Sequence, residues 1–451
     1  MMKANARSFA LIALAFSLSA CGAGTSNPPP NPPEDPKIVP GDLDETFGTK
    51  GMALYDDPIQ GAISNEEGRR VAIQPDGKIV VAGYIQSSAP VFASALVLRY
   101  DASGVLDNTF GTDGVVTFDP AYRFLDGYGV SIQADGKIVV VGDSGLPDPN
   151  VVLARLNPDG TLDSTFGAGG VASFDVNDSD YGYAVAIQTD GKIVVVGETS
   201  IASDRYALVL RCNSDGTLDG AFGMGGIVTY DSPGWDSANG VAIQSDAKIV
   251  VTGSTSLPYP ETSLTDLLVF RLNGDGTLDN AFGANGVATF DLIYDEGMSA
   301  LIQPDGKIVI VGGVWSYSSA QDAVLVLRYK DDGTLDDSFG TGGVVTYNPD
   351  DADYKFGEGA ALQTDGKIVV VGYICDSAGI DFLVLRYNPN GALDTTFGGD
   401  GMVEYKKGEG FSGGYGVAIQ SDGKLVVSGN STFHDQYSDY AVLVMRIIGR
   451  Q

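Results

Sequence analysis

One hexapeptide, Leu-Asp-x-x-Phe-Gly, occurs seven times along this chain of 451 residues. From the first copy to the last, the period is about 58 residues. Self-similarity at such a period is typical of folds that stack one small structural unit many times. It therefore constrains the fold more than any single residue does. The copies begin at Leu43, Leu106, Leu162, Leu218, Leu278, Leu335 and Leu393.

Each repeat carries further segments in a constant order. One of these segments, AIQTDGKIVVVG (186–197), contains two short apolar runs joined by Asp-Gly. A second is an alternating stretch that ends in Arg and its neighbour, such as LVLRC (208–212). A third follows the hexapeptide, as GGVASFD (169–175) does. The runs are rich in Val, Ile, Leu and aromatic residues and are bounded by Gly and Asp, a pattern that predicts β-strands. Four strands in each repeat give about 28 strands, and no helical pattern of useful length follows residue 21.

The Asp-Gly pairs between apolar runs predict antiparallel hairpins. We expect positive φ at both residues of each pair, a conformation that Asp and Gly tolerate. One repeat has Asp246-Ala247 instead, and Ala at positive φ costs about 1 kcal/mol. The turns therefore favour four-stranded antiparallel units with one local defect.

Such units, repeated seven times, predict an all-β, seven-bladed β-propeller. The Gln-ending strand is built from small residues and suits the crowded inner position, whereas the Gly-Gly-Val strand is expected outermost. Residues 43–56 contain an outer strand without a blade, and the last unit stops at 446–448 without an outer strand. We therefore expect the N-terminal strand to complete the last blade and close the ring, which would leave no exposed sheet edge there.

The N-terminus has a different composition. Residues 1–20 combine Lys3 and Arg7 with an apolar stretch and read as a signal peptide. The sequence before Cys21 resembles a bacterial lipobox, which predicts lipidation of Cys21; the alternative is a plain secretory signal. Residues 21–40 are rich in Pro and read as a tether to the propeller at 43–449. The expected location is extracytoplasmic, lipid-anchored to the bacterial membrane, and to the outer membrane if the cell has one.

The formal net charge is −31. An acidic surface of this kind argues against nucleic-acid partners and against docking on anionic lipid head groups. It suits basic partners or divalent cations. We expect a monomer that contacts the membrane through its lipid anchor only.

Residues that recur in every repeat, such as the Asp of each hexapeptide, are expected to be structural. A catalytic centre needs one asymmetric group of residues, which seven copies around a ring cannot provide. The Asp is expected to accept a backbone N–H bond from two residues further on. The Leu and Phe of the hexapeptide are expected to pack between blades.

Function is therefore expected in the connections that vary between repeats. These loops are acidic and aromatic, and aromatic rings beside carboxylates and amides suit sugar rings or peptide side chains. The alternative is that the rings only cap the ends of the blades. The candidate ligand-binding residues are Tyr122, Tyr181, Trp235, Tyr259, Trp315 and Tyr354.

Two loops could hold Ca²⁺ through oxygen side chains, at Asp175, Asn177 and Asp180 and at residues 350–353. Neither has the full calcium-loop pattern, so a solvated acidic loop is the favoured interpretation. Ca²⁺ is the one cofactor considered. The single histidine, His434, has too few soft ligands around it for a zinc site.

Enzymatic signals are sparse. The starts of the inner strands read mostly Gly, Ala and Tyr, with Arg69, Arg70, Glu296 and Glu358 as exceptions. A carboxylate pair of the kind used by glycosidases is compatible with these residues, although none is singled out.

The motifs NPDGTLDSTFGAGGVASFD (157–175) and AIQTDGKIVVVG (186–197) resemble the delta-60 repeat of bacterial surface and secreted proteins. The resemblance covers about 90% of the chain. It implies a seven-bladed propeller in an extracytoplasmic setting, without catalytic residues to carry over.

The expectation from the sequence is a non-enzymatic envelope lipoprotein that binds a protein or glycan partner through its variable loop face. The alternative is a polysaccharide-acting enzyme, for which an Asp/Glu pair at the channel mouth would be the discriminating sign. A third alternative is a purely structural envelope component.

Overall fold

The computed structural model describes residues 39–57, 64–88, 91–202, 204–256, 265–292, 294–315, 322–348, 354–376, 379–405, 412–432 and 440–450. These residues form strands and one short 3-10 helix, Pro120–Tyr122. Cys21, Tyr259, His434 and residues 350–353 lie outside the described residues. No helix among the described residues is long and apolar enough to cross a membrane.

The strands follow the fourfold pattern of the repeats. The Gln-ending first strands are β2 (Ser64–Ile73), β6 (Asp126–Ile132), β10 (Ser179–Ile187), β14 (Asp236–Ile243), β18 (Asp295–Ile302), β22 (Tyr354–Leu362) and β26 (Ser412–Ile419). The second strands are β3 (Ile79–Ser88), β7 (Ile138–Asp143), β11 (Ile193–Ile201), β15 (Ile249–Ser256), β19 (Ile308–Val314), β23 (Ile368–Asp376) and β27 (Leu425–Thr432).

The third and fourth strands complete each repeat. The third strands are β4 (Val91–Tyr100), β8 (Val151–Leu156), β12 (Asp204–Cys212), β16 (Thr265–Leu272), β20 (Ala323–Tyr329), β24 (Gly379–Tyr387) and β28 (Tyr440–Ile447). The fourth strands are β1 (Met52–Tyr55), β5 (Val115–Thr117), β9 (Val171–Phe174), β13 (Ile227–Tyr230), β17 (Val287–Phe290), β21 (Val344–Tyr347) and β25 (Met402–Tyr405).

The fold is all-β and consists of antiparallel sheets of the β-propeller type. Five four-stranded sheets contain β6–β9, β10–β13, β14–β17, β18–β21 and β22–β25, each in chain order. The expected strand order is confirmed in these sheets, with the Gln-ending strand at one edge and the Gly-Gly-Val strand at the other. An eight-stranded sheet has the order β26-β27-β28-β2-β3-β4-β5, with β1 paired to β28.

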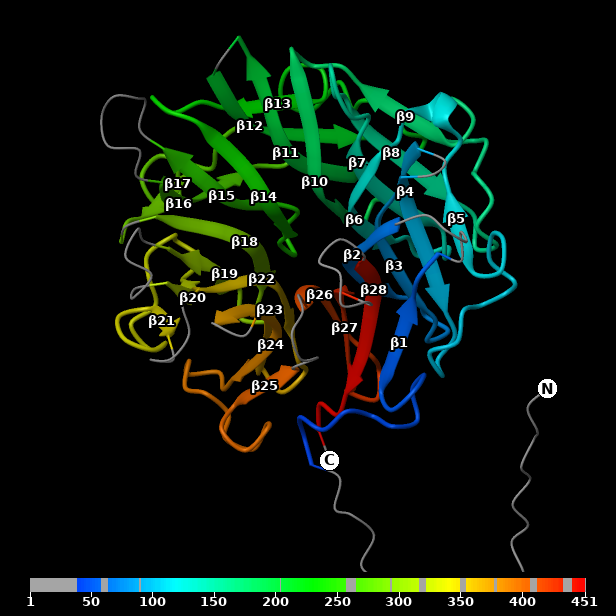
Figure 1. The fold of residues 1–451 in the computed structure, drawn as a ribbon. Helices are drawn as coiled ribbons and strands as arrows, with labels where there is room; N and C mark the ends of the chain where they lie inside the picture. The colour runs from blue at the N-terminus through cyan, green and yellow to red at the C-terminus, as the bar shows by residue number, and fades with distance from the viewer. Residues whose placement is uncertain are drawn as a thin grey trace, which may run out of the picture. The chain divides into compact units, whose positions relative to one another are not determined.

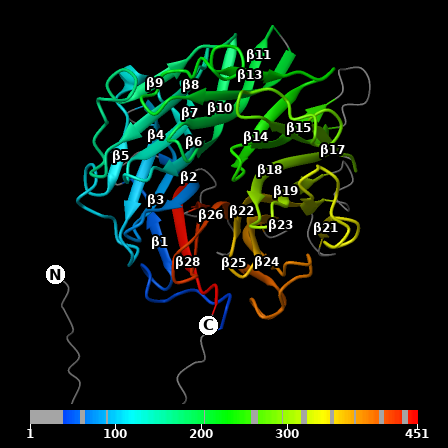
Figure 2. The ribbon, with the colours of Figure 1, turned by 180° about the vertical axis from the view of Figure 1, so that it is seen from behind.

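The first strands of successive sheets lie next to one another. β2 contacts β6, and the contacts continue through β10, β14, β18 and β22 to β26, which in turn contacts β2. In Figures 1 and 2 these strands lie toward the centre and the fourth strands toward the periphery. Side chains at the start of every first strand are thereby directed to one central region.

The two ends of the described chain meet in one sheet. β1 pairs antiparallel with β28, with Leu54 opposite Leu443, and Leu43 forms a further bridge to Ile447. Figure 1 shows the blue strand β1 beside the red strand β28. This is the pairing that the orphan outer strand predicted.

The hairpin turns differ from expectation at one position. Gly191 has positive φ, as predicted, and Ala247 also adopts it, with φ 67°. Asp190 does not, because Gly191 N–H donates to the Gln188 carbonyl and closes a tight turn before the glycine. The turn is a type I turn followed by one left-handed residue, so the prediction of positive φ at both residues is wrong.

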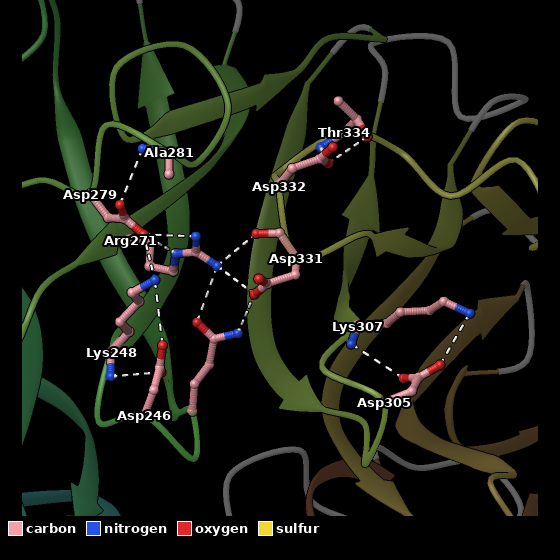
Figure 3. Close-up of polar contacts among 11 residues, drawn as sticks. Asp246, Lys248, Arg271, Asp279, Ala281, Asp305, Lys307, Asp331, Asp332 and Thr334 are labelled. Carbon is pink, nitrogen blue, oxygen red and sulfur yellow. Dashed lines mark hydrogen bonds and ion pairs between the residues drawn. The ribbon is translucent and has the colours of Figure 1, made fainter.

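The recurring Asp, Arg and Lys form a clasp that we define on Asp279, Arg271 and Lys248 (Figure 3). One oxygen of Asp279 accepts Arg271 Nε at 2.8 Å and Arg271 Nη2 at 2.7 Å, and Lys248 Nζ lies 3.2 Å away. The other oxygen accepts the Ala281 N–H at 3.1 Å, as predicted for this residue. The Arg comes from the third strand and the Lys from the hairpin turn, so the Asp ties both to the hexapeptide.

The clasp also joins neighbouring sheets. Arg271 Nη1 donates to the Asp331 carbonyl of the following repeat at 2.7 Å, and its guanidinium lies 4.9 Å from the ring centroid of Phe282. The structural role expected for these residues is confirmed by this geometry. Asp pairs with Arg at 44/446, 107/99, 163/155, 219/211, 279/271, 336/328 and 394/386.

The apolar core lies between sheets. Phe166 of the hexapeptide is fully buried in a cluster that joins β7 and β8 to β11 and β12, with Val141, Leu153 and Leu208 among its members. Similar clusters lie between the other neighbouring sheets. The expected packing of the hexapeptide Phe between repeats is therefore confirmed.

Phe166→Ala should lower the free energy of unfolding by about 3 to 5 kcal/mol, because it leaves a cavity between two sheets. Met224→Ala, at a side chain that is 89% exposed, is the control and should change stability by less than about 0.5 kcal/mol. Denaturant unfolding measures both variants. Equal effects would contradict the packing role of Phe166.

The clasp should make the fold sensitive to acid. Burial raises the pKa of Asp336, but hydrogen bonds from Ser338 and the charges of Arg328 and Lys307 outweigh this and lower the pKa to about 2. A carboxyl whose pKa is lower in the folded state stabilises it above the unfolded pKa of about 3.9, and this contribution is lost as pH falls toward 2. The midpoint of thermal unfolding should therefore fall as pH is lowered from about 4 to about 2.

Asp336→Asn should cost about 3 to 5 kcal/mol at neutral pH, since it leaves the buried guanidinium of Arg328 without its carboxylate partner. The exposed neighbour provides the control variant Asp337→Asn, which should behave like the wild type. A variant that unfolds at the wild-type denaturant concentration would show that the clasp does not stabilise the fold.

Candidate functional site

Every first strand carries a β-bulge near its start. The pairing with the second strand shifts by one residue at each of them, for example between Gly357 and Gly359. A bulge leaves one residue out of the ladder and redirects its side chain. The seven bulge residues are Arg69, Tyr128, Tyr183, Asn239, Met298, Glu358 and Tyr415.

All seven bulge residues line one cavity of about 460 Å³, which we call the central cavity. It lies at the ends of the strands opposite the Asp-Gly hairpins, on the side of the variable connections. Its volume is in the range of small-molecule and sugar sites. The fold therefore repeats the same bulge seven times and places five different residue types on it, with Tyr in three of the repeats.

The central cavity is asymmetric. Among the described second and third strands, those that line the cavity are β11, β12, β15 and β16. They contribute Glu198, Arg205, Ser254, Ser256 and Thr265. The cavity thus extends outward between these two sheets, past Trp235. We call this extension the arm of the cavity.

Four glutamates line the cavity. Glu67 lies 3.4 Å from Arg69, and Glu198 lies 3.5 Å from Arg205. Glu296 accepts a hydrogen bond from Asn239 Nδ2 at 2.8 Å. Glu358, at the bulge of β22, completes the set.

Glu358 has the most perturbed acidity of these groups. Burial raises the pKa of its carboxyl, the charge of Arg70 lowers it, and the charges of Glu296 and Glu67 raise it, with a result of about 7. Burial also raises the pKa of Glu296, which Asn239 opposes. A carboxyl that is half protonated at neutral pH can act as a general acid or base.

Tyrosines form one wall of the cavity. The rings of Tyr128 and Tyr183 meet edge to face at 5.4 Å, and the Arg69 guanidinium lies 4.2 Å from the Tyr128 centroid. Burial raises the pKa of Tyr128, Tyr183 and Tyr415, so these phenols are neutral donors. They offer apolar faces and O–H groups to the same ligand.

Of the predicted aromatic residues, Trp235 lines the cavity. Its ring is 53% exposed and lies 5.3 Å from the Arg205 guanidinium. Tyr181 stands behind the wall, stacked on Tyr183 at 6.2 Å. These two residues therefore belong to the arm of the cavity or adjoin its wall.

The other candidates are not brought to this site. Tyr122 packs against the core cluster between β3 and β4 on one side and β7 and β8 on the other. Trp315 stacks on Tyr294 at 4.6 Å, and Tyr354 stacks on Tyr373 at 5.8 Å. Tyr259 lies outside the described residues.

The calcium candidates have partners within the protein. Asp180 accepts the Val176 N–H at 2.6 Å and the Thr199 hydroxyl at 2.5 Å, whereas Asp175 is exposed. Asp236 closes its own loop in the same way, through Ser232 N–H at 2.6 Å. Within the described residues no three His, Cys, Asp or Glu side chains form a metal-binding group. Calcium binding stays a prediction.

The sequence marks Arg69, Arg70, Glu296 and Glu358 as charged residues at the starts of inner strands, but it does not show that they line one cavity. The repeats themselves contain a signal for the bulge residues. When the repeats are aligned on the recurring Gln, the position five residues before that Gln varies in residue type, as Glu358 before Gln363 illustrates. Glu198 and Arg205 give no such signal, since they lie on a second and a third strand.

Six segments of the chain match the family described as "Domain of unknown function (DUF5122) beta-propeller". They are residues 74–110, 133–166, 188–222, 244–282, 303–339 and 363–397. Each runs from the Gln of a first strand to the Phe of the hexapeptide. No curated protein matches the sequence.

Several solved structures are similar to this chain. The polysaccharide lyase Uly1 is 10% identical, with 92% of this chain and 98% of that chain covered and a TM-score of 0.49. A PL25 ulvan lyase bound to -[GlcA(1-4)Rha3S]- is 11% identical, with 92% and 95% covered and a TM-score of 0.47. The α-L-arabinofuranosidase ARB93A from Fusarium graminearum is 10% identical, with 71% and 92% covered and a TM-score of 0.42. At these identities the similarity shows the fold alone.

The expectation of a non-enzymatic scaffold is corrected by the residues that line the central cavity. The sequence singled out no carboxylate pair, whereas in the structure Glu67, Glu198, Glu296 and Glu358 line one cavity. The discriminating sign of the enzymatic alternative is thus present.

Glu358 should titrate near neutral pH. Because its folded pKa is raised, the stability that its protonated form contributes is present below the unfolded pKa and is lost as pH rises through about 7. Glu358→Gln should therefore gain stability relative to the wild type as pH rises from 4 to 8. Thermal midpoints across that range test this, and a constant difference between the two proteins would contradict it.

Proposed function

We propose that this protein is an extracytoplasmic enzyme that hydrolyses a polysaccharide in the central cavity. The observation that supports this proposal is the convergence of four glutamates at the cavity, one of them close to half protonation at neutral pH. Hydrolysis of a glycosidic bond requires one carboxyl that donates a proton and one that remains ionised. The cavity offers both kinds of carboxyl.

Glu358 is the proposed general acid. Its proton goes to the glycosidic oxygen as the bond to the anomeric carbon breaks, and water supplies the hydroxyl group that replaces the leaving sugar. Glu296 is the proposed second carboxyl, because the hydrogen bond from Asn239 favours its carboxylate form against the effect of burial and its charge acts on Glu358. It accepts the proton that the attacking water releases. The two residues differ in environment, as an acid and its partner must.

We further propose a closed propeller of seven blades as the scaffold. The cyclic contacts of the first strands and the β1–β28 pairing support it. The family match covers six segments, and the seventh unit is divided between residues 420–446 and 43–48, at opposite ends of the chain. Because each match to the family covers one continuous segment, a unit that is split between the two ends of the chain would not be matched.

The delta-60 identity of the repeats, lipidation at Cys21 and display outside the cell also remain proposals. A signal peptide and a Pro-rich tether would place the cavity where polysaccharides of the envelope or the surroundings are available. The resulting prediction is that Cys21→Ser releases the protein from the membrane fraction.

Glu358→Gln should lower kcat on a cleaved polysaccharide by about 10²- to 10⁴-fold, which is the usual contribution of a general acid. The release of reducing ends from xylan, arabinan, polygalacturonate and alginate measures it. Glu45→Gln, at an exposed residue of the first hexapeptide, is the control and should retain full activity. Cleavage of none of these polymers by the wild type, or full activity of Glu358→Gln, would refute the assignment.

A further inference from the structure

Arg70 breaks the repeat pattern at a position where the other repeats keep a small residue. It follows the bulge residue of β2, and its counterparts are Gly129, Ala184, Gly240, Ser299, Gly359 and Gly416. The position is crowded, because a Cβ at Gly240 would lie 2.7 Å from the Met298 carbonyl of the next first strand. A large side chain here departs from what the scaffold requires, and such departures mark functional positions.

The guanidinium of Arg70 lacks the carboxylate partner that the other arginines of the cavity and those of the clasps have. Its Nη1 donates to the main-chain carbonyls of Tyr415 at 2.6 Å and Arg69 at 3.2 Å. Within the described part of the chain, no carboxylate forms an ion pair with it. By contrast, Arg69 and Arg205 each have a glutamate within 3.5 Å, and the clasp arginines each hold an aspartate.

The uncompensated charge is costly. Burial lowers the pKa of Arg70, and the charge of Glu358, which opposes this, is only partial at neutral pH. A partly buried cation without a paired anion destabilises a fold. The cavity therefore holds a cation that destabilises the fold. Its remaining N–H groups are available to an anionic ligand that enters the cavity.

We propose that Arg70 is an anion subsite of the central cavity, and that the polysaccharide is one whose sugars carry a carboxylate or a sulfate group. The inference rests on the proposed function and specifies its substrate class. A guanidinium binds either anion through paired N–H bonds. The net charge of −31 does not prevent this, because charges farther away than about 8 to 10 Å are screened at physiological salt.

Binding to chemically matched glycans tests the proposal. The Glu358→Gln chain, which should bind without turnover, is titrated by calorimetry with polygalacturonate, its methyl ester, κ-carrageenan and desulfated carrageenan. The charged member of at least one pair should bind about tenfold or more tightly than its neutral form. Adding Arg70→Met should abolish that preference, Arg70→Lys should retain part of it, and the exposed-site control Arg123→Gln should leave it unchanged.

Equal binding of charged and neutral forms, an unchanged preference in Arg70→Met, or no binding of either charged glycan would each overturn the proposal. Turnover separates it from the proposed function. Charge-dependent binding without cleavage by the wild type would refute the hydrolase alone. Cleavage of a neutral polymer with charge-independent binding would refute the anion subsite alone.

Stability provides a readout that a structural arginine would not give. Without ligand, Arg70→Met should unfold at a higher temperature than its parent, because it removes an uncompensated charge. A charged glycan should raise the midpoint of the parent but not of Arg70→Met. A lower midpoint in Arg70→Met, together with retained binding, would indicate a structural residue.

Discussion

The aspartate of the hexapeptide is the interaction on which the rest of the fold depends. Each copy accepts an N–H of its own turn with one oxygen and holds an arginine and a lysine with the other, as Asp279 does with Arg271 and Lys248. The same arginine reaches the main chain of the next repeat. One carboxylate therefore joins a turn, a third strand and a hairpin, and through the arginine it also sets the distance to the neighbouring sheet.

Because this frame is supplied by residues away from the cavity, the cavity is free to vary. The bulge of each first strand is a feature of the backbone and tolerates Arg, Tyr, Asn, Met or Glu at the same position. Stability is concentrated on the hairpin side and between sheets, whereas the other ends of the strands carry charge that the fold does not need. The division separates the requirements of folding from those of chemistry.

The sequence predicted the strands, their order within each sheet and the structural role of the recurring residues, because all of these follow from patterns that repeat locally. It did not predict the central cavity, since residues such as Glu67 and Glu358 lie about 290 positions apart and meet only through the arrangement of the sheets. The position of the aromatic residues relative to the cavity also depends on how the sheets are arranged. Trp235 and Trp315 occur in similar loops, but Trp235 lines the cavity and Trp315 stacks on a tyrosine of its own sheet.

The pairing of β1 with β28 has a consequence for biosynthesis. Asp44 is bonded to Arg446, 402 residues further along the chain, so this clasp cannot form until Arg446 has been synthesised. The internal repeats hold their partners much closer in sequence, as Asp163 and Arg155 do eight positions apart. The early strands therefore have local contacts to fold with, while residues 43–55 must wait for the last segment. A circular permutation that links the old ends and opens new termini at an internal hairpin would bring Asp44 and Arg446 close together in sequence. Their clasp could then form early, from local contacts.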